Sequence, residues 1–150
     1  MVYRPSGPAG IGAAGGSALS LLLLDTTCLV DAEHAGGFLA GTIEDDDDLA
    51  VAAITLAELL AGVRLAQGRR RAARQRFVSR LLDEIPVIPY DTTVAAAHGD
   101  LLAEVRRSGP PRGAHDLIIA ATARATHRTV VTADRKAFTG LSGVEWRSCR

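Results

Sequence analysis

The chain is poor in cysteine and lysine and carries no excess charge of either sign. Its 150 residues include 17 basic and 17 acidic side chains, so the formal net charge is zero, and Lys136 is the only lysine. General electrostatic attraction to a nucleic acid is therefore no basis for assigning a function, and any anion binding must be local. Cys28 and Cys149 show no CxxC spacing and no clustered histidines, so they suggest neither a zinc site nor a disulfide framework. Cys28 stands in an apolar context and is interpreted as a core residue.

Long hydrophobic runs are also missing. No stretch reaches the roughly 18 apolar residues of a membrane-spanning helix. A faint likeness to a signal peptide fails, because glycines interrupt the apolar part and no small-residue cleavage site precedes Asp25. We therefore expect a cytoplasmic protein without membrane association. Residues 1–19 are expected to form a flexible Gly/Ala-rich tail and residues 20–150 a single domain with a real core.

Short apolar runs alternate with helical patterns from Leu21 onward. Four consecutive leucines predict a buried strand over 21–24, and similar runs predict strands at 49–54 and 129–132, with short extended pieces at 86–90 and 144–146. Apolar residues at helical spacing predict helices over 55–65, 69–85 and 114–126, one that opens at Asp91, and a short one at 133–138. Strands that alternate with helices indicate βαβ units and a parallel sheet covered on both faces.

Four acidic residues stand at boundaries between these elements. Asp25 and Asp134 directly follow predicted strands, while Glu58 and Asp116 lie early in predicted helices. Parallel strands end, and the helices after them begin, at one edge of the sheet, so the four carboxylates should meet there. Three of them also have a structural explanation: Thr55 to Glu58 matches a capping box, and Asp116 and Asp134 suit helix starts. The acidic run at 44–48 (EDDDD) is interpreted as a solvated loop.

Four carboxylates in one pocket would repel each other unless a cation lies among them. Oxygen ligands favour Mg²⁺ or Mn²⁺, and the four histidines show no ligand spacing, which argues against zinc. A site of this kind suits metal-assisted hydrolysis of a phosphodiester.

The motifs LLLLDTT, ITLAELLAG, GAHDLIIAATA and VVTADRKAF, in this order and spacing, resemble the PIN domain. Within it they resemble the VapC-type toxins of bacterial toxin–antitoxin pairs, over about residues 21–147. The resemblance implies a three-layer α/β/α fold with a central parallel sheet and a Mg²⁺-dependent endoribonuclease site, in which Mn²⁺ can substitute. By position, Asp25, Glu58 and Asp116 match the three core acids, and Asp134 matches the fourth, more variable one.

The resemblance also implies supporting residues and partners. Thr27 matches the small hydroxyl residue after the first acid, and Thr132 is expected to support the acids in the same way. The partners implied are RNA, a small VapB-like antitoxin that covers the site, and a second copy of the chain or a hetero-oligomer. His115 stands where such toxins often have Asn, and the residues after Asp134 depart from the usual pattern.

A neutral chain needs local positive charge to hold RNA. Arg112, in the loop before the third acid, and Arg70 and Arg74, on the basic helix, are the predicted RNA contacts. A solvated surface is the alternative for all three, and contact with the antitoxin is a further alternative for the helix. Two other functions stay open. A phosphatase of the haloacid dehalogenase type would need a second Asp where this chain has Thr27. A catalytically inactive PIN-like module would only bind RNA or a protein.

Overall fold

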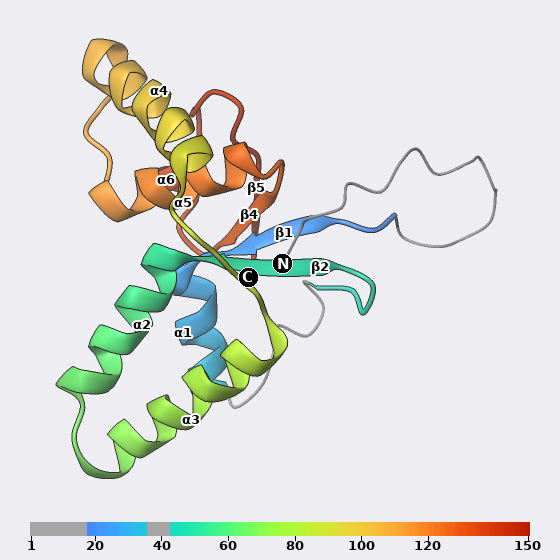
Figure 1. The fold of residues 1–150 in the computed structure, drawn as a ribbon, viewed down its shortest axis with the longest axis vertical. Coiled ribbons are helices and arrows are strands. Elements are labelled where there is room, and N and C mark those ends of the chain that lie inside the picture. The colour runs from blue at the N-terminus through green and yellow to red at the C-terminus, as the bar shows by residue number, and fades with distance from the viewer. Residues whose placement is uncertain (1–17, 36–42) are drawn as a thin grey trace.

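The computed structural model describes residues 18–35 and 43–150 of the chain. The tail predicted over 1–19 lies outside the described residues, except for its last two. Figure 1 shows the strands and helices of the described part. The strands are β1 (Leu21–Leu24), β2 (Asp48–Ala52), β3 (Val87–Ile88), β4 (Thr129–Thr132) and β5 (Trp146–Ser148). The helices are α1 (Thr26–His34), α2 (Ala53–Leu65), α3 (Gly68–Glu84), α4 (Thr92–Ser108), α5 (Ala114–Ala125) and α6 (Arg135–Phe138).

The described strands form one parallel sheet in the order β3-β2-β1-β4-β5. The leucine strand β1 lies at its centre, where Leu23 pairs with Ala50 on one side and Val130 on the other. All side chains of Leu22 to Leu24 are at most 1% exposed. A central strand of a parallel sheet is covered on both faces, which explains the uninterrupted apolar run. The predicted α/β fold with a parallel sheet is confirmed.

Alternation along the strands divides the core into two layers. Leu23 packs with Leu101, Ile119 and Phe138 in a cluster on the side of α4, α5 and α6. Leu22 and Leu24 face the other side, in a cluster with residues of α1, α2 and α3, among them Leu29, Val63 and Leu81. Helices therefore cover both faces of the sheet and make three layers, as Figure 1 shows. Within the described residues, no helix is long and apolar enough to cross a membrane.

The start of α2 corrects one prediction. The helix begins at Ala53, two residues before the predicted start, so Thr55 lies inside it and is fully buried. The Thr55 Oγ1 has no hydrogen-bond partner, and the cap position is held by Ala52 without a side-chain bond. The capping-box interpretation of Thr55 and Glu58 is therefore wrong, which leaves the Glu58 carboxylate available for other contacts.

The acidic run is only partly a solvated loop. Its first three residues are exposed, but the Asp47 side chain is just 3% exposed. Asp47 accepts hydrogen bonds from the backbone N–H groups of Glu44 and Ser20 and faces Arg147 at 3.3 Å. The Glu44 hydrogen bond is the main cause that lowers the Asp47 pKa. Asp48 begins β2 and pairs with Arg128 at 2.8 Å, so the end of this run joins the sheet.

Cys28 and Cys149 form a disulfide, so the prediction that the chain has no disulfide framework is wrong. Cys28 of α1 is bonded to Cys149, which follows β5, with their Cα atoms 6.1 Å apart. The two residues are 121 positions apart in sequence, and only the arrangement of β1, β4 and β5 brings them together. Cys28 is fully buried, as expected of a core residue. The expectation of a cytoplasmic protein loses the support that it took from the cysteines.

Candidate active site

Asp25 leaves the central strand and caps the helix that follows. Its Oδ1 accepts a hydrogen bond of 2.7 Å from the backbone N–H of Thr26, and its side chain is only 2% exposed. A buried carboxylate is costly unless its oxygen atoms are hydrogen-bonded. The strand end and the cap together fix where the carboxylate stands.

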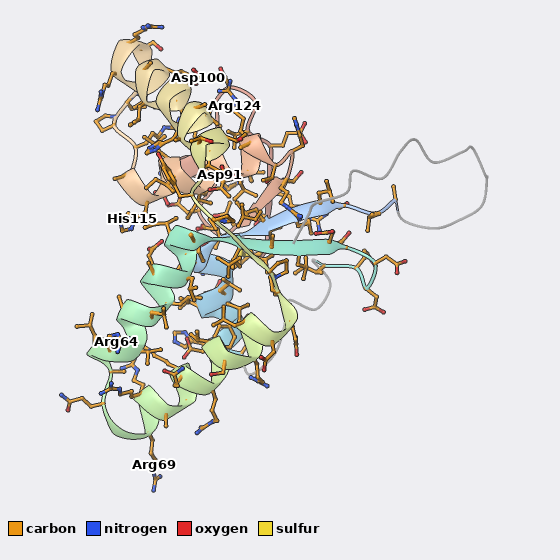
Figure 2. The ribbon with its side chains drawn as sticks, viewed as in Figure 1. Arg64, Arg69, Asp91, Asp100, His115 and Arg124 are labelled. Atoms are coloured by element: carbon orange, nitrogen blue, oxygen red, sulfur yellow. A yellow bond between two sulfur atoms is a disulfide. The ribbon has the colours of Figure 1, made fainter. Side chains whose placement is uncertain are left out.

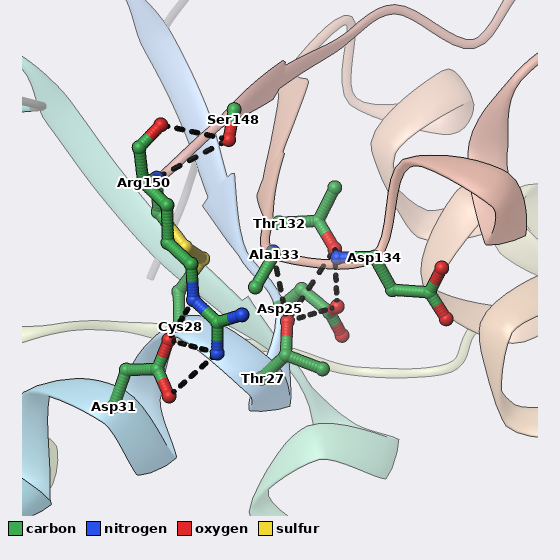
Figure 3. A network of polar contacts seen from close by, with 10 residues as sticks. Asp25, Thr27, Cys28, Asp31, Thr132, Ala133, Asp134, Ser148 and Arg150 are labelled. Carbon is green, nitrogen blue, oxygen red and sulfur yellow. Dashed lines mark hydrogen bonds and ion pairs between the residues drawn. A yellow bond between two sulfur atoms is a disulfide. The ribbon is translucent and has the colours of Figure 1, made fainter.

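Two threonine hydroxyl groups hold the second oxygen of Asp25. Thr132 donates to Oδ2 at 2.7 Å and Thr27 donates to the same atom at 2.9 Å. Each hydroxyl in turn accepts a backbone N–H, Thr27 from Ala133 at 3.0 Å and Thr132 from Asp134 at 2.9 Å. Figure 3 shows this network at the ends of β1 and β4. Because the hydroxyl oxygens accept from the backbone, their protons point at Asp25 and hold it in one orientation.

Glu58 reaches the same place from α2. The Thr26 hydroxyl donates to its Oε1 at 3.1 Å, and His115 Nδ1 lies 3.7 Å from its Oε2. The His115 side chain is 57% exposed, and Figure 2 shows it where α5 begins, beside the start of α2. His115, which stands where VapC-type toxins often have Asn, thus faces Glu58.

Asp116 lies in the first turn of α5, against the backbone of Gly113. A Cβ atom at position 113 would stand 2.5 Å from Asp116 Oδ2, so the carboxylate occupies space that only a glycine leaves open. Burial raises the Asp116 pKa most, the nearby charges of Asp25, Asp134 and Glu58 raise it further, and His115 acts in the opposite direction. The charges of the other three predicted acids therefore act on Asp116.

Asp134 follows β4 and is exposed. It occupies the position before α6, but its side chain makes no capping hydrogen bond. The interpretation of Asp134 as a helix cap is therefore wrong. Its carboxylate is directed away from Asp25 in Figure 3, although both residues line the same pocket.

The pocket has a volume of about 470 Å³ and lies at the carboxyl edge of the sheet. It is lined by acids and their neighbours: Asp25, Thr26, Thr27, Val30, Asp31, Glu58, Asp116, Ala133, Asp134 and Arg150. All four predicted acids thus reach one cavity, together with a fifth, Asp31. The Thr132 hydroxyl supports them from beneath through Asp25.

The donor set of this pocket fits a hard divalent cation. Its candidate ligands are carboxylate oxygens, and the pKa of Asp116 is raised first by burial and then by like charges that a cation would offset. In the part of the chain that the structure describes, no three acidic, histidine or cysteine side chains form a ready-made group for a metal ion. Mg²⁺ commonly keeps several of its waters and takes only one or two carboxylates directly, so the residues fit Mg²⁺ better than a metal that needs a complete protein cage.

The predicted RNA contacts lie elsewhere, and two of them hold the fold together. Arg112 donates to the backbone carbonyls of Lys136, Ala137 and Thr139 at 2.7, 3.0 and 2.6 Å, which ties the loop before α5 to α6. Arg74 donates to the Gly62 carbonyl at 2.9 Å and lies 3.7 Å from Glu33, so it fastens α3 to α2 and α1.

Arg70 is exposed on α3, and none of the three predicted arginines is among the described residues that line the acid pocket. Arg64 and Arg69 mark the far end of the α2–α3 pair in Figure 2. Arg150 does line the pocket, and the sequence patterns gave no reason to expect it.

This fold and its acidic edge define a class of protein, and a sequence model of the PIN domain matches residues 22–142. The chain belongs to the PIN domain family. That membership decides against the haloacid dehalogenase alternative, which also lacks its second Asp, because Thr27 stands there and donates to Asp25.

Among its relatives are VapC proteins. The tRNA(fMet)-specific endonuclease VapC of Salmonella typhimurium is 36% identical over 98 residues, which cover 64% of this chain and 71% of that protein. Ribonuclease VapC10 of Mycobacterium tuberculosis is 32% identical over 108 residues, covering 69% and 74% of the two chains. The resemblance to VapC-type toxins is confirmed.

Solved structures of VapBC complexes share the fold. A chain of DNA-bound VapBC from Salmonella typhimurium superposes with a TM-score of 0.77 at 23% identity, covering 88% of this chain and all of that one. A chain of VapBC-5 from Mycobacterium tuberculosis gives a TM-score of 0.70 at 28% identity, covering 86% and 98%. The three-layer architecture is therefore that of VapC-type PIN domains.

Proposed function

We propose that the chain is a metal-dependent endoribonuclease that hydrolyses RNA phosphodiesters as the toxin of a type II toxin–antitoxin pair. The observation that carries the proposal is the meeting of Asp25, Glu58, Asp116 and Asp134 in one pocket, with Asp25 oriented by two hydroxyl groups. The names of the VapC relatives, which are ribonucleases and endonucleases, support the same activity.

Asp25 and Asp116 are proposed to hold Mg²⁺, with Glu58 and Asp134 as further ligands or as holders of a water molecule. When bound, Mg²⁺ lowers the pKa of a water and offsets charge on the phosphate. Mn²⁺ offers the same preference for oxygen ligands and should substitute.

The protein's own contribution is orientation. Thr27 and Thr132 hold Asp25 Oδ2 and the backbone N–H of Thr26 holds Oδ1, so the carboxylate needs little rearrangement when a cation or substrate arrives. Glu58 is similarly directed by Thr26. Water that attacks the phosphorus and displaces the 3′-oxygen leaves a 5′-phosphate and a 3′-hydroxyl.

A small VapB-like antitoxin is the proposed partner, and it would cover the acid pocket. The structural neighbours are toxin–antitoxin complexes, which supports a partner of this kind for the present chain. We also propose that the chain assembles as a homodimer or as a hetero-oligomer with the antitoxin.

The activity is tested on purified, partner-free protein with a mixed RNA pool, in Mg²⁺, in Mn²⁺ and in EDTA. Cleavage should require the metal and should vanish in Asp25→Ala and Asp116→Ala. Asp45→Ala, an exposed acid outside the pocket, is the matched control and should cut normally. New ends with a 5′-phosphate separate this chemistry from contaminating ribonucleases that leave cyclic phosphates.

Cleavage that survives both substitutions would show that the site is elsewhere or that the activity is foreign. RNA binding and metal binding without any cleavage, in a preparation of intact protein, would instead favour the inactive PIN-like binding module.

A further inference from the structure

Arg150 stands in the acid pocket although the sequence places it 125 positions after Asp25. The strand β5 runs parallel to β4, so its end reaches the same edge of the sheet as Thr132 and Asp25. The backbone N–H of Cys149 donates to the Thr132 carbonyl at 3.1 Å, which extends this pairing by one residue. Arg150 is thereby delivered to the edge where the acids meet.

Asp31, Ser148 and the neighbouring disulfide hold Arg150 there. Its Nε donates to Asp31 Oδ2 at 2.8 Å and its Nη2 donates to Asp31 Oδ1 at 3.1 Å. The neighbouring Cys149 is bonded covalently to Cys28 on α1, and the Arg150 backbone N–H and carbonyl both contact the Ser148 hydroxyl. Figure 3 shows the arginine side chain running beside the disulfide to Asp31, with the Asp25 network next to it.

The contact with Asp31 orients the guanidinium and leaves part of it open. Asp31 engages Nε and Nη2, while Nη1 has no hydrogen-bond partner among the described residues. The side chain is 67% exposed. A guanidinium held along one side by a carboxylate presents its remaining donors in a fixed plane, which suits a phosphate.

The Arg150 guanidinium matters for RNA binding because the rest of the pocket is negatively charged. Five carboxylates line the pocket, and Arg150 is the only positive side chain among the described residues that do so. RNA is a polyanion and needs local positive charge to approach such a surface. Arg112 and Arg74, which were predicted to supply it, are bonded to backbone carbonyls instead.

We infer that Arg150 binds a phosphate group of the RNA next to the bond that is cut, and that Asp31 and the Cys28–Cys149 disulfide hold it in place for this task. This inference rests on the proposed ribonuclease function and names the chain's own phosphate-binding residue.

RNA affinity, measured without cleavage, is the first test. The Asp116→Asn background keeps the RNA intact, and a fluorescein-labelled single-stranded RNA of mixed sequence is titrated in Mg²⁺ at several salt concentrations. Arg150→Gln should raise Kd about tenfold. The plot of log association constant against log salt concentration should become less steep by about 0.7, as expected for one lost phosphate contact to a single strand. Arg106→Gln removes the same charge from an exposed site outside the pocket and should change neither value.

The results separate this inference from the proposed function. Normal RNA binding by Arg150→Gln, with an unchanged salt slope, would overturn the inference while wild-type cleavage still upheld the nuclease. Tighter binding would also overturn it, because Arg150 would then block the pocket. Wild-type protein that neither binds nor cuts RNA would contradict both the inference and the proposed ribonuclease function.

A double-mutant cycle tests the part played by the disulfide. Cys149→Ser frees the segment that carries Arg150 and should weaken RNA binding severalfold. Arg150→Gln should then cost less in the Cys149→Ser background than in the intact chain, because an arginine that is no longer held contributes less. Equal costs in the two backgrounds would contradict a positioning role for the disulfide, and circular dichroism shows whether each variant is folded.

Discussion

At the scale of the residue, Asp25 is held by hydroxyl groups whose own oxygens are occupied by backbone N–H groups. Its position after β1, and the threonine two residues later, could be predicted because both belong to one short motif. The contact with Thr132 follows from the pairing of β1 with β4, which the parallel order of the sheet implies.

Thr132→Val keeps the shape of the side chain and removes the hydroxyl. It takes one buried hydrogen bond from Asp25 and removes the partner of the partly buried N–H of Asp134, at a cost of about 1–3 kcal/mol in unfolding free energy. Because the carboxylate then turns more freely, we expect roughly a 10- to 100-fold loss of metal affinity or activity. Mn²⁺ titration measures the metal affinity and single-turnover cleavage measures the activity. Thr132→Ser should recover most of both, and a Thr132→Val variant with normal metal affinity would contradict this role.

Asp116→Asn should stabilise the metal-free protein. Burial and three neighbouring acids raise the Asp116 pKa above its ordinary value of 3.8, so the folded state disfavours the ionised form. The Asp116 contribution to stability is therefore complete below about pH 3.8 and is lost as the pH rises through the raised pKa. The difference in unfolding free energy in favour of Asp116→Asn should grow as the pH rises from about 3.8 through the raised pKa and then level off.

Thermal unfolding in EDTA as a function of pH measures this difference. With Mg²⁺ or Mn²⁺ present the order should reverse, since the ion stabilises only the chain that binds it. A pH-independent difference between the two proteins would contradict the electrostatic origin of the effect.

At the scale of the element, the strands were predicted well because an apolar run with a charge at its end is local information. Helix starts were predicted unevenly: Asp91 caps α4 and α5 begins at Ala114, both as predicted, whereas the starts of α2 and α6 are each two residues off. A cap depends on which backbone groups the tertiary structure leaves open. The helix predicted from Thr55 begins at Ala53, and the last strand, predicted at 144–146, is Trp146–Ser148. Because the last strand was predicted to end at residue 146, Cys149 and Arg150 were not expected at the carboxyl edge of the sheet.

Gly113→Ala tests how the start of α5 places Asp116. The Gly113 φ of −59° suits alanine, so the backbone is not strained, but the new Cβ would stand 2.5 Å from the Asp116 carboxylate. We expect at least a tenfold loss of metal affinity with a stability change below about 1 kcal/mol. Gly99→Ala is the matched control, since that helical glycine has open space around it, and it should stabilise the chain by about 0.5–1 kcal/mol. Unchanged metal binding in Gly113→Ala would show that Asp116 can serve from another position.

At the scale of the whole molecule, contacts between distant parts of the chain are what the sequence could not supply. The disulfide joins residues 121 positions apart, and the arginines at 74, 112 and 150 differ in role only because of what the fold places opposite them. An arginine near the third acid in sequence proved structural, while one at the far end of the chain lines the pocket.

Reduction of the Cys28–Cys149 disulfide should lower the unfolding free energy by about 2–4 kcal/mol, because the bond closes a long loop and restricts the unfolded chain. Urea unfolding with and without reductant measures the change, and Cys28→Ser/Cys149→Ser should match the reduced wild type. Identical midpoints in the two conditions would mean that the bond does not constrain the unfolded state.

The most direct test of the acid pocket as a catalytic centre is a single Mn²⁺ titration in which metal binding and RNA cleavage are followed together. We predict that cleavage rises along the binding curve, that both are lost in Asp116→Asn, and that both are retained in Asp45→Asn. Cleavage without metal, or Mn²⁺ binding of unchanged affinity in Asp116→Asn, would contradict a metal-dependent site built from these acids.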